Sequence, residues 1–254
     1  MNHEKAIKVD NVTMAYGNFV VMRDLNFTVE GGQVTVIMGG SGCGKSTLLR
    51  HMIGLLDPAK GDIYFGDTNF TGATEAKQEL MKQQFGVLYQ GGALWSSMTL
   101  EENVALPLHY YTKLTDKEIK DVVSYKLSLV GLAGFEDFLP GQISGGMRKR
   151  AALARAIALD PDFLFLDEPS AGLDPVTSKR LDELILQLRD TVGATVVVVS
   201  HELASIFSIA DQAVYLDAKS RTLLDLGKPD ELLKHSQHAA VREFLSRGEV
   251  AAQT

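Results

Sequence analysis

The residues best suited to chemistry lie in a glycine-rich stretch at 39–46 that ends in Lys45 and Ser46. The stretch has the spacing G-x-x-x-x-G-K-[ST] and follows an apolar run at 34–38, so we expect it to connect a strand to a helix. Glycines let successive backbone N–H groups turn toward one anion, and the start of the helix adds the positive end of its dipole. Lys45 would reach the β- and γ-phosphates, and the Ser46 hydroxyl suits Mg²⁺, which prefers oxygen ligands. The stretch predicts a Mg²⁺-nucleotide site rather than an ordinary glycine-rich turn.

Two adjacent carboxylates form the next candidate group. Asp167 and Glu168 follow a continuous apolar run at 163–166, which is typical of a parallel strand covered on both faces. Neighbouring residues that leave a strand point in different directions. Asp167 can therefore hold the Mg²⁺ shell while Glu168 faces an attacking water. The alternative, two surface carboxylates at a strand-to-turn junction, is disfavoured by the glycine loop upstream.

Gln90 and His201 follow two further predicted strands, at 85–89 and 195–199. Ligands of open α/β sheets bind beyond the carboxyl ends of the strands, so Gln90 could touch Mg²⁺ or the attacking water and His201 could donate to a γ-phosphate. Tyr16 could lay its ring on an adenine. Taken alone, each of these residues also suits an ordinary structural role, an exposed loop or a packed strand end.

Composition limits the class of protein. The chain has 254 residues, 45% of them hydrophobic, with a net charge of −7 and a pI near 5.4, so no overall basic field is present to hold nucleic acid or an anionic membrane. Residues 1–9 lack a long apolar segment, and the strongest apolar run, 194–199, is too short to cross a bilayer. Any membrane link is therefore expected to come from a partner. The single Cys43 allows no internal disulfide, which fits a reducing cytoplasm, and it suits a small loop residue better than a redox switch.

The order of elements predicts an α/β fold with a mainly parallel sheet. Alternating residues at 7–29 predict an N-terminal antiparallel β-subdomain, and residues 91–158 read as an inserted helical subdomain with Thr115 and Ser144 as helix N-caps. Residues 1–90 and 159–227 would form the core and 228–254 a tail helix. One hypothesis is that the apolar face at 241–245 of this tail docks on a second copy of the chain.

Two features of the insertion have more than one interpretation. The apolar residues at 93–98 either plug the core of the insertion or line a groove for a partner helix. Arg148, Lys149, Arg150 and Arg155 resemble a nucleic-acid patch, but a short basic run on one helix of an acidic chain is usually a solvated face or a set of local ion pairs.

Taken together and in this order, the motifs resemble the nucleotide-binding subunit of an ABC transporter over nearly the whole chain. The matching positions are the Walker A loop at 39–46, the Q-loop residue Gln90, the signature at 144–146, Walker B ending at Asp167, the D-loop at 170–174, the switch histidine His201 and the adenine-stacking Tyr16. The resemblance implies a P-loop NTPase core that hydrolyses ATP, with Glu168 as catalytic base and with His201, Gln90 and Lys45 as further catalytic residues. It implies Ser46, Gln90 and Asp167 as Mg²⁺ ligands. The nucleotide contacts that it implies are Tyr16, Gly39, Gly40, Ser41, Gly42, Cys43, Gly44, Lys45, Ser46, Thr47, Ser144, Gly145, Gly146 and Asp174.

The resemblance also implies a homodimer. Two copies would sandwich two ATP molecules head to tail, each held by the Walker A loop of one copy and the Ser144 helix terminus of the other. The signature reads Ile-Ser-Gly-Gly-Met, where the common form is Leu-Ser-Gly-Gly-Gln. Met147 cannot supply the polar contact of that glutamine, which predicts a looser grip on nucleotide across the dimer.

The stretches at 91–99 and 146–150 look like the Mla branch of this family, which moves phospholipids at Gram-negative inner membranes and maintains outer-membrane lipid asymmetry. This similarity implies an MlaE-like permease, an MlaD-like MCE lipid-binding protein and often an MlaB-like STAS-domain protein. The chain would then sit peripherally on the cytoplasmic face of the inner membrane, held by the permease. One alternative is the ATPase of a small-solute importer, for example for an amino acid. Another is a non-transport ABC ATPase acting on ribosomes or DNA, which the single motif set and the lack of a long coiled-coil insert disfavour; no nucleic-acid partner is expected.

Overall fold

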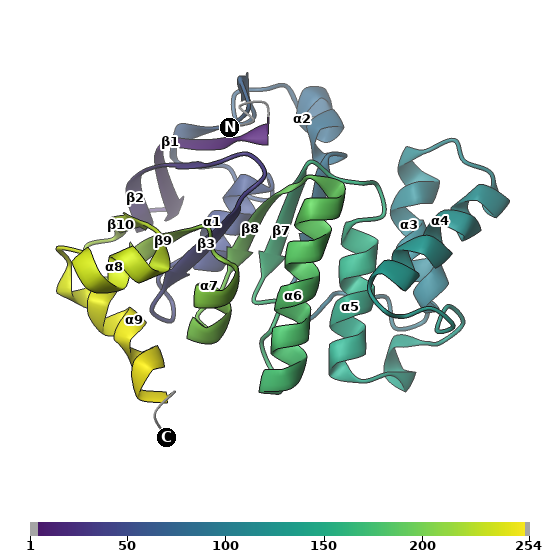
Figure 1. The fold of residues 1–254 in the computed structure, drawn as a ribbon. Coiled ribbons are helices and arrows are strands. Elements are labelled where there is room, and N and C mark those ends of the chain that lie inside the picture. The colour runs from purple at the N-terminus through teal and green to yellow at the C-terminus, as the bar shows by residue number, and fades with distance from the viewer. Residues whose placement is uncertain (1–4, 252–254) are drawn as a thin grey trace.

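The computed structural model describes residues 5–251, and only the backbone within residues 247–251. Its strands form two sheets (Figure 1). The smaller sheet is antiparallel in the order β2-β1-β4-β5, with β1 (Ile7–Tyr16), β2 (Phe19–Val29), β4 (Lys60–Phe65) and β5 (Thr68–Asn69). The larger sheet has the order β10-β9-β3-β8-β7-β6, with β3 (Val34–Gly39), β6 (Phe85–Leu88), β7 (Phe163–Asp167), β8 (Thr195–Val199), β9 (Gln212–Asp217) and β10 (Thr222–Gly227). All of its pairs are parallel except β9 with β10.

The central strands of the larger sheet are covered on both faces, which explains their continuous apolar sequences. Successive side chains of a strand point to opposite faces, so each strand feeds two separate cores. One core lies between the two sheets and takes Phe163 and Phe165 of β7 with Val197 and Val199 of β8. The opposite core takes the residues between them, Leu164, Leu166, Val196 and Val198.

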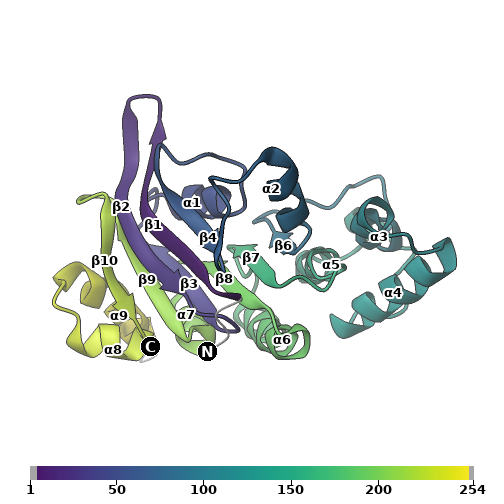
Figure 2. The same ribbon diagram turned by 90° about the horizontal axis from the view of Figure 1, so that it is seen from above.

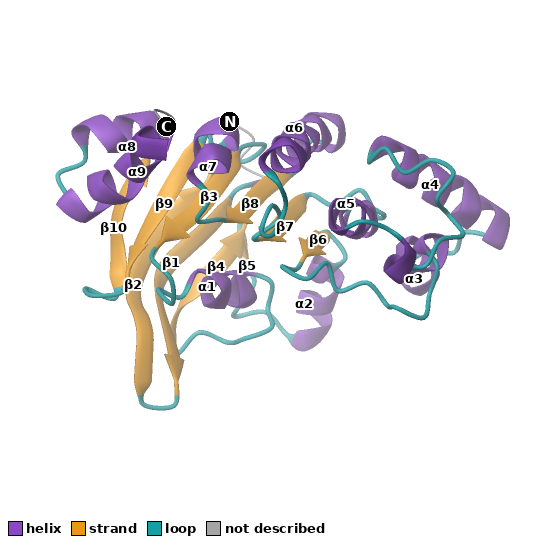
Figure 3. Ribbon diagram, turned by 90° about the horizontal axis from the view of Figure 1, so that it is seen from below, coloured by secondary structure: helices purple, strands orange, loops and turns teal. Residues whose placement is uncertain are grey.

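Helices fill both sides of the larger sheet (Figure 3). Helix α1 (Lys45–Met52) packs between the sheets through Leu48, Leu49 and Met52. Helices α6 (Pro175–Val192), α7 (Leu203–Ile209), α8 (Pro229–His235) and α9 (Ala239–Ala251) cover the other face. The short helix α2 (Glu75–Lys82) has no buried residue and precedes β6.

The insertion forms a separate helical region beside the sheet (Figure 2). It contains α3 (Leu100–Tyr111), α4 (Asp116–Leu129), the 3₁₀ turn η2 (Pro140–Gln142) and α5 (Gly145–Ala156). Thr115 caps α4 in a reciprocal capping box with Glu118, and Ser144 caps α5 by accepting from the Met147 N–H at 3.2 Å. Both predicted N-caps are confirmed, as is the predicted class: a mainly parallel core, an antiparallel β-subdomain and an inserted helical subdomain.

The tail helix docks on its own domain, so the hypothesis that its apolar face docks on a second copy is wrong. Val241 and Leu245 are both 0% exposed within the single chain, and Phe244 packs edge-on against Tyr215 of β9 with ring centroids 5.4 Å apart. An apolar stripe on a terminal helix is buried wherever a neighbouring core accepts it, and here α7, α8 and β9 provide that surface. Within residues 5–251, no helix combines the length and the apolarity needed to span a bilayer.

Candidate nucleotide site

A cleft of about 730 Å³ opens at the carboxyl ends of β3, β7 and β8, and the glycine-rich loop forms its floor. The loop begins at Gly39, where φ is 144° and an added Cβ would lie 2.3 Å from the Leu216 carbonyl oxygen. Only glycine fits this close approach of two backbones. The Lys45 ammonium donates to the carbonyls of Gly39 at 3.0 Å and Gly40 at 3.1 Å, which holds it inside the loop.

The lining of the cleft combines apolar and polar side chains. Its residues are Tyr16, Phe19, Val21, Gly39, Gly40, Ser41, Gly42, Gly44, Lys45, Ser46, Thr47, Gln90, Glu168, His201, Leu203 and Phe244. Cys43 is absent from this lining, because its side chain is buried beside Gly39. Burial raises the pKa of its thiol. This agrees with the interpretation of Cys43 as a small packing residue.

Ser46 and Asp167 meet next to this floor. The Ser46 Oγ donates to Asp167 Oδ1 at 2.9 Å, although the two residues lie on α1 and β7. A hydroxyl and a carboxylate oxygen suit Mg²⁺, which takes few protein ligands and completes its shell with phosphate and water. Two oxygen donors leave most of the shell of a Mg²⁺ ion open, so the pair fits an ion that arrives with a phosphate.

Glu168 and His201 form a pair over the cleft. Glu168 Oε1 lies 2.7 Å from His201 Nδ1, whereas Glu168 Oε2 is buried and, within residues 5–246, has no hydrogen-bond partner. A buried carboxylate oxygen without a partner is costly unless a water or ligand reaches it. The backbone of Glu168 has φ of 49°, an unusual conformation for a non-glycine residue. This carboxylate is therefore held where it can accept a proton from a water in the cleft.

The basic residues of α5 hold loop carbonyls. The expectation of a solvated face fits Arg148, which is exposed, but is wrong for Lys149, which is buried. Lys149 is only 7% exposed and donates to the carbonyls of Gln90 and, at 3.2 Å, Glu168. Arg155 donates to the carbonyls of Gly92 at 2.9 Å and Ala93 at 2.8 Å. Burial lowers the pKa of Lys149, and the nearby carboxylates of Asp167 and Glu168 oppose that shift. All four basic residues of this run donate to backbone carbonyls.

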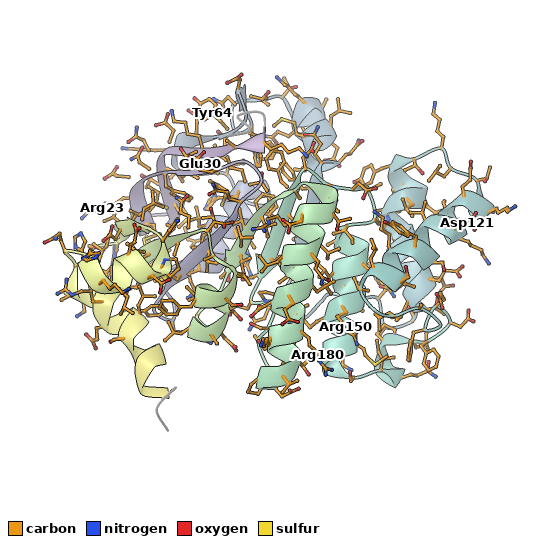
Figure 4. The ribbon with its side chains drawn as sticks, in the orientation of Figure 1. Arg23, Glu30, Tyr64, Asp121, Arg150 and Arg180 are labelled. Atoms are coloured by element: carbon orange, nitrogen blue, oxygen red, sulfur yellow. The ribbon has the colours of Figure 1, made fainter. Side chains whose placement is uncertain are left out.

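The remaining two cations of α5 also donate to backbone carbonyls. Arg148 donates to the carbonyl of Ile143 at 3.1 Å, and Arg150 donates to the carbonyls of Val130 at 2.9 Å and Gly131 at 3.0 Å. Figure 4 shows Arg150 on α5 beside Arg180 on α6, and burial with the repulsion of Arg180 lowers the pKa of Arg150.

The signature residues lie away from the first cleft. Ser144, Gly146 and Met147 line a second cavity of about 320 Å³ between α5 and α6, together with Arg150 and Arg180. Asp174 caps α6 and accepts from the N–H groups of Val176 at 3.1 Å and Thr177 at 3.0 Å; hydrogen bonds from Thr177 lower the pKa of Asp174.

One chain thus brings together the glycine-rich loop, Tyr16, Gln90, Glu168 and His201. It does not bring Ser144, Gly145, Gly146 or Asp174 to that cleft.

Trp95 does not plug the core of the insertion. Its side chain is 62% exposed, whereas Leu94 is half-buried against the core. Asn103 on α3 is fully buried and fixes the loop: its Oδ1 accepts from the Trp95 N–H at 2.8 Å, and its Nδ2 donates to three carbonyls, including that of Trp95 at 3.1 Å. The loop therefore presents Trp95 to the outside in a fixed position.

Three residues near the site were not identified from the sequence. Phe19 is paired with Tyr16 across the β1–β2 hairpin, so the two side chains share one face. The two turn residues between them, Gly17 and Asn18, could have revealed this register. Phe244 reaches the cleft only because α9 folds back on β9, and no local signal gives that packing. Lys149 looked like an exposed residue of a basic run, since sequence does not show which loops approach a helix.

Fold and cleft define a nucleotide-binding P-loop protein, and comparisons with known proteins extend this conclusion. Residues 22–171 match the family model described as ABC transporter. The ATP-binding cassette MJ0796, solved as a dimer bound to ADP and phosphate, superposes with a TM-score of 0.79 at 28% identity, covering 87% of this chain and 98% of that chain.

Relatives of known description also belong to ABC transport systems as ATP-binding proteins. The chain is 39% identical over 243 residues to the intermembrane phospholipid transport system ATP-binding protein MlaF of Haemophilus influenzae, covering 96% of this chain and 91% of the relative. The Escherichia coli protein of the same name is 40% identical, with 94% and 88% covered. A probable ribonucleotide transport ATP-binding protein, mkl of Mycobacterium tuberculosis, is 40% identical over 95% of this chain, which spans 66% of the length of that relative. The chain belongs to the ABC transporter family of transport ATPases, as one of its ATP-binding proteins.

Proposed function

We propose that the chain binds and hydrolyses Mg²⁺-ATP in the cleft of about 730 Å³ and that hydrolysis drives a separate permease that moves phospholipid. The observation that supports hydrolysis most directly is the unpartnered Oε2 of Glu168, which belongs to a residue lining the same cleft as the glycine-rich loop. A carboxylate so placed can orient and deprotonate the water that attacks a γ-phosphoryl group.

The other polar residues would bind the phosphates, the Mg²⁺ ion and the attacking water. Lys45 and the backbone N–H groups of the loop hold phosphate charge, and Ser46 with Asp167 would hold Mg²⁺, which offsets charge on the transferred phosphoryl. Gln90 at the rim would contact the ion or the water. His201 uses Nδ1 for Glu168, which leaves Nε2 for the γ-phosphoryl.

A second copy would complete the site. Ser144 and its helix terminus lie in the second cavity, so they can reach a nucleotide only if it is bound by another chain. Each ATP would lie between the Walker A loop of one copy and residues 144–146 of the other. The dimeric state of the MJ0796 cassette supports this arrangement. Because this composite site exists only in the closed dimer, ATP would favour closure through its differential affinity for the two states.

The transported substrate is inferred from the relatives. Extensive similarity to the two MlaF proteins favours phospholipid, an MlaE-like permease, an MlaD-like MCE protein and a STAS-domain partner, with the chain held on the cytoplasmic face of the inner membrane. Trp95, whose side chain is exposed and whose backbone is held by Asn103, would give that permease an apolar contact. The mkl match favours a second candidate, a small-solute transporter. Purifying the intact complex and analysing its bound molecules by mass spectrometry separates the two: co-purified phospholipid supports the first, and a small solute without lipid supports the second.

Hydrolysis is tested by Glu168→Gln. Removing the base while keeping the shape of the side chain should lower kcat about 10²- to 10⁴-fold with ATP binding retained. Lys45→Ala serves as the comparison variant, because it should weaken ATP binding itself. Turnover close to that of the unaltered protein in Glu168→Gln would remove Glu168 from the role of base.

A further inference from the structure

Lys149 occupies an unusual position for a lysine. It lies in the second turn of α5, five residues after the Ser144 cap, and its side chain passes into the protein rather than toward solvent. Its ammonium donates to the backbone carbonyl of Gln90 and, at 3.2 Å, to that of Glu168. These carbonyls belong to the segments that follow β6 and β7, which are paired neighbours in the sheet. One buried cation therefore joins the signature helix to two loops of the nucleotide cleft.

The Glu168 backbone needs such support. Its φ of 49° is a strained conformation for a non-glycine residue and persists only where surrounding contacts impose it. Three contacts do so here: the Glu168 N–H donates to the Val199 carbonyl at 2.9 Å, and the Glu168 carbonyl accepts from Ala171 N–H at 3.2 Å and from Lys149. Of these, only Lys149 comes from the helical subdomain.

The same helix also controls the loop after Gln90. Arg155 donates to the carbonyls of Gly92 and Ala93. Residues 90–93 are therefore bound to α5 at two positions, Lys149 and Arg155. A displacement of α5 would therefore move this loop with it. Lys149 alone extends the attachment to Glu168 and so fixes the distance between Glu168 and Gln90.

We propose that Lys149 is a positioning residue for hydrolysis, through which the signature helix sets the place of the Glu168 carboxylate relative to Gln90. This inference rests on the proposed role of Glu168. A partner copy that engages residues 144–146 would act on the same rigid helix that carries Lys149. Binding of the partner copy would thereby act through Lys149 on the position of the Glu168 carboxylate and of the water that it activates.

Full-length chain purified with its permease allows a direct test. Lys149→Met keeps the length and apolar stem of the side chain but removes the donors. A misplaced catalytic group costs up to about 100-fold in rate, so we expect kcat to fall about 10- to 100-fold, with the Kd for ATP within about 3-fold of the original value. Lys149→Arg, which keeps charge and donors, should return kcat to within about 5-fold of the unaltered protein. Equal losses in kcat and in ATP affinity, or an unchanged kcat, would overturn the proposal.

A matched control is Lys126→Met. Lys126 on α4 is also a buried lysine of the helical subdomain, 2% exposed, but its recorded ion pair is with Asp160 and not with the cleft. This variant should lose stability and keep its kcat per folded molecule. A comparable fall in kcat in Lys126→Met would show that any buried lysine of the subdomain has this effect, which contradicts a specific role for Lys149.

Glu168→Gln distinguishes failure of this inference from failure of the proposed function. If Lys149 acts through Glu168, then Lys149→Met should slow single-turnover hydrolysis in the Glu168→Gln background by less than about 3-fold, because coupled residues are not additive. The same 10- to 100-fold fall in both backgrounds would exclude action through Glu168. Full activity of Glu168→Gln would instead refute the proposed function, whatever Lys149→Met does.

Discussion

Phe19 allows a quantitative prediction about how the base of ATP is held. Tyr16 and Phe19 line the cleft together with residues 39–42 and 44–47, where the phosphates are expected. The two aromatic residues are direct cross-strand partners, so their side chains share one face of the hairpin. The guanidinium of Arg221 lies 5.1 Å from the centre of the Phe19 ring and covers part of it. The pair offers a preformed platform for a purine.

The expected effect follows from the exposed surface of the rings. Tyr16 is 51% and Phe19 59% exposed, so both have surface to offer to a base. Stacking of one base on aromatic side chains is worth about 1–3 kcal/mol, and dividing it between two rings gives about 1 kcal/mol for Phe19. Phe19→Ala should therefore raise the Kd for ATP about 5-fold, and the double variant with Tyr16→Ala about 30-fold. The rings contact ground state and transition state equally, so kcat at saturating ATP should stay unchanged.

Equilibrium titration with a fluorescent ATP analogue, followed by displacement with ATP, measures these constants. Phe138→Ala is the matched control, because Phe138 is another partly exposed phenylalanine, 39% exposed, outside the cleft. Its Kd should match that of the unaltered protein. A Kd that stays unchanged in Phe19→Ala and rises in Tyr16→Ala would place the base on Tyr16 alone and refute the two-ring platform.

Two further predictions concern the fold around the site. Gly39→Ala should abolish ATP binding or folding, because the new Cβ would lie 2.3 Å from the Leu216 carbonyl oxygen, whereas Gly40→Ala meets nothing within 4 Å and should stay folded; circular dichroism and ATP titration compare them. Burial raises the pKa of Asp182 on α6 from 3.8 to about 6, although Ser205 donates a hydrogen bond to it. The folded state thus favours the protonated acid, and the resulting stabilisation is present below pH 3.8 and is lost as the pH rises through about 6. Asp182→Asn should remove this part of the pH dependence of the free energy of unfolding, measured by urea titration; an unchanged slope would contradict it.

The sequence was sufficient for the parts of the fold that depend on local pattern. Continuous apolar runs predicted the buried strands β7 and β8, and the Thr115 and Ser144 caps predicted where α4 and α5 begin. Gln90, Glu168 and His201 were each predicted to follow the carboxyl end of a strand and so to lie at one edge of the sheet. All three line the cleft. Their catalytic roles stay predictions.

The parts that the sequence did not reveal depend on packing between distant segments. The basic run of α5 was expected to be a solvated face or a set of local ion pairs. Lys149 is instead buried and Arg155 partly buried, because the loop at 90–93 and the end of β7 approach their helix. The apolar stripe of α9 was equally compatible with docking in its own domain or on a second copy. Only the position of β9 and α7 decides between the two.

The central claim is that a second copy completes each nucleotide site. Light scattering of Glu168→Gln protein measures it directly, with Mg²⁺-ATP present or absent and with Ser144→Arg added. We predict an ATP-dependent dimer in Glu168→Gln, and a monomer that still binds ATP when Ser144→Arg is also present. Undiminished ATP-dependent dimerisation in the double variant would contradict the composite site, as would a Glu168→Gln protein that binds ATP and stays monomeric.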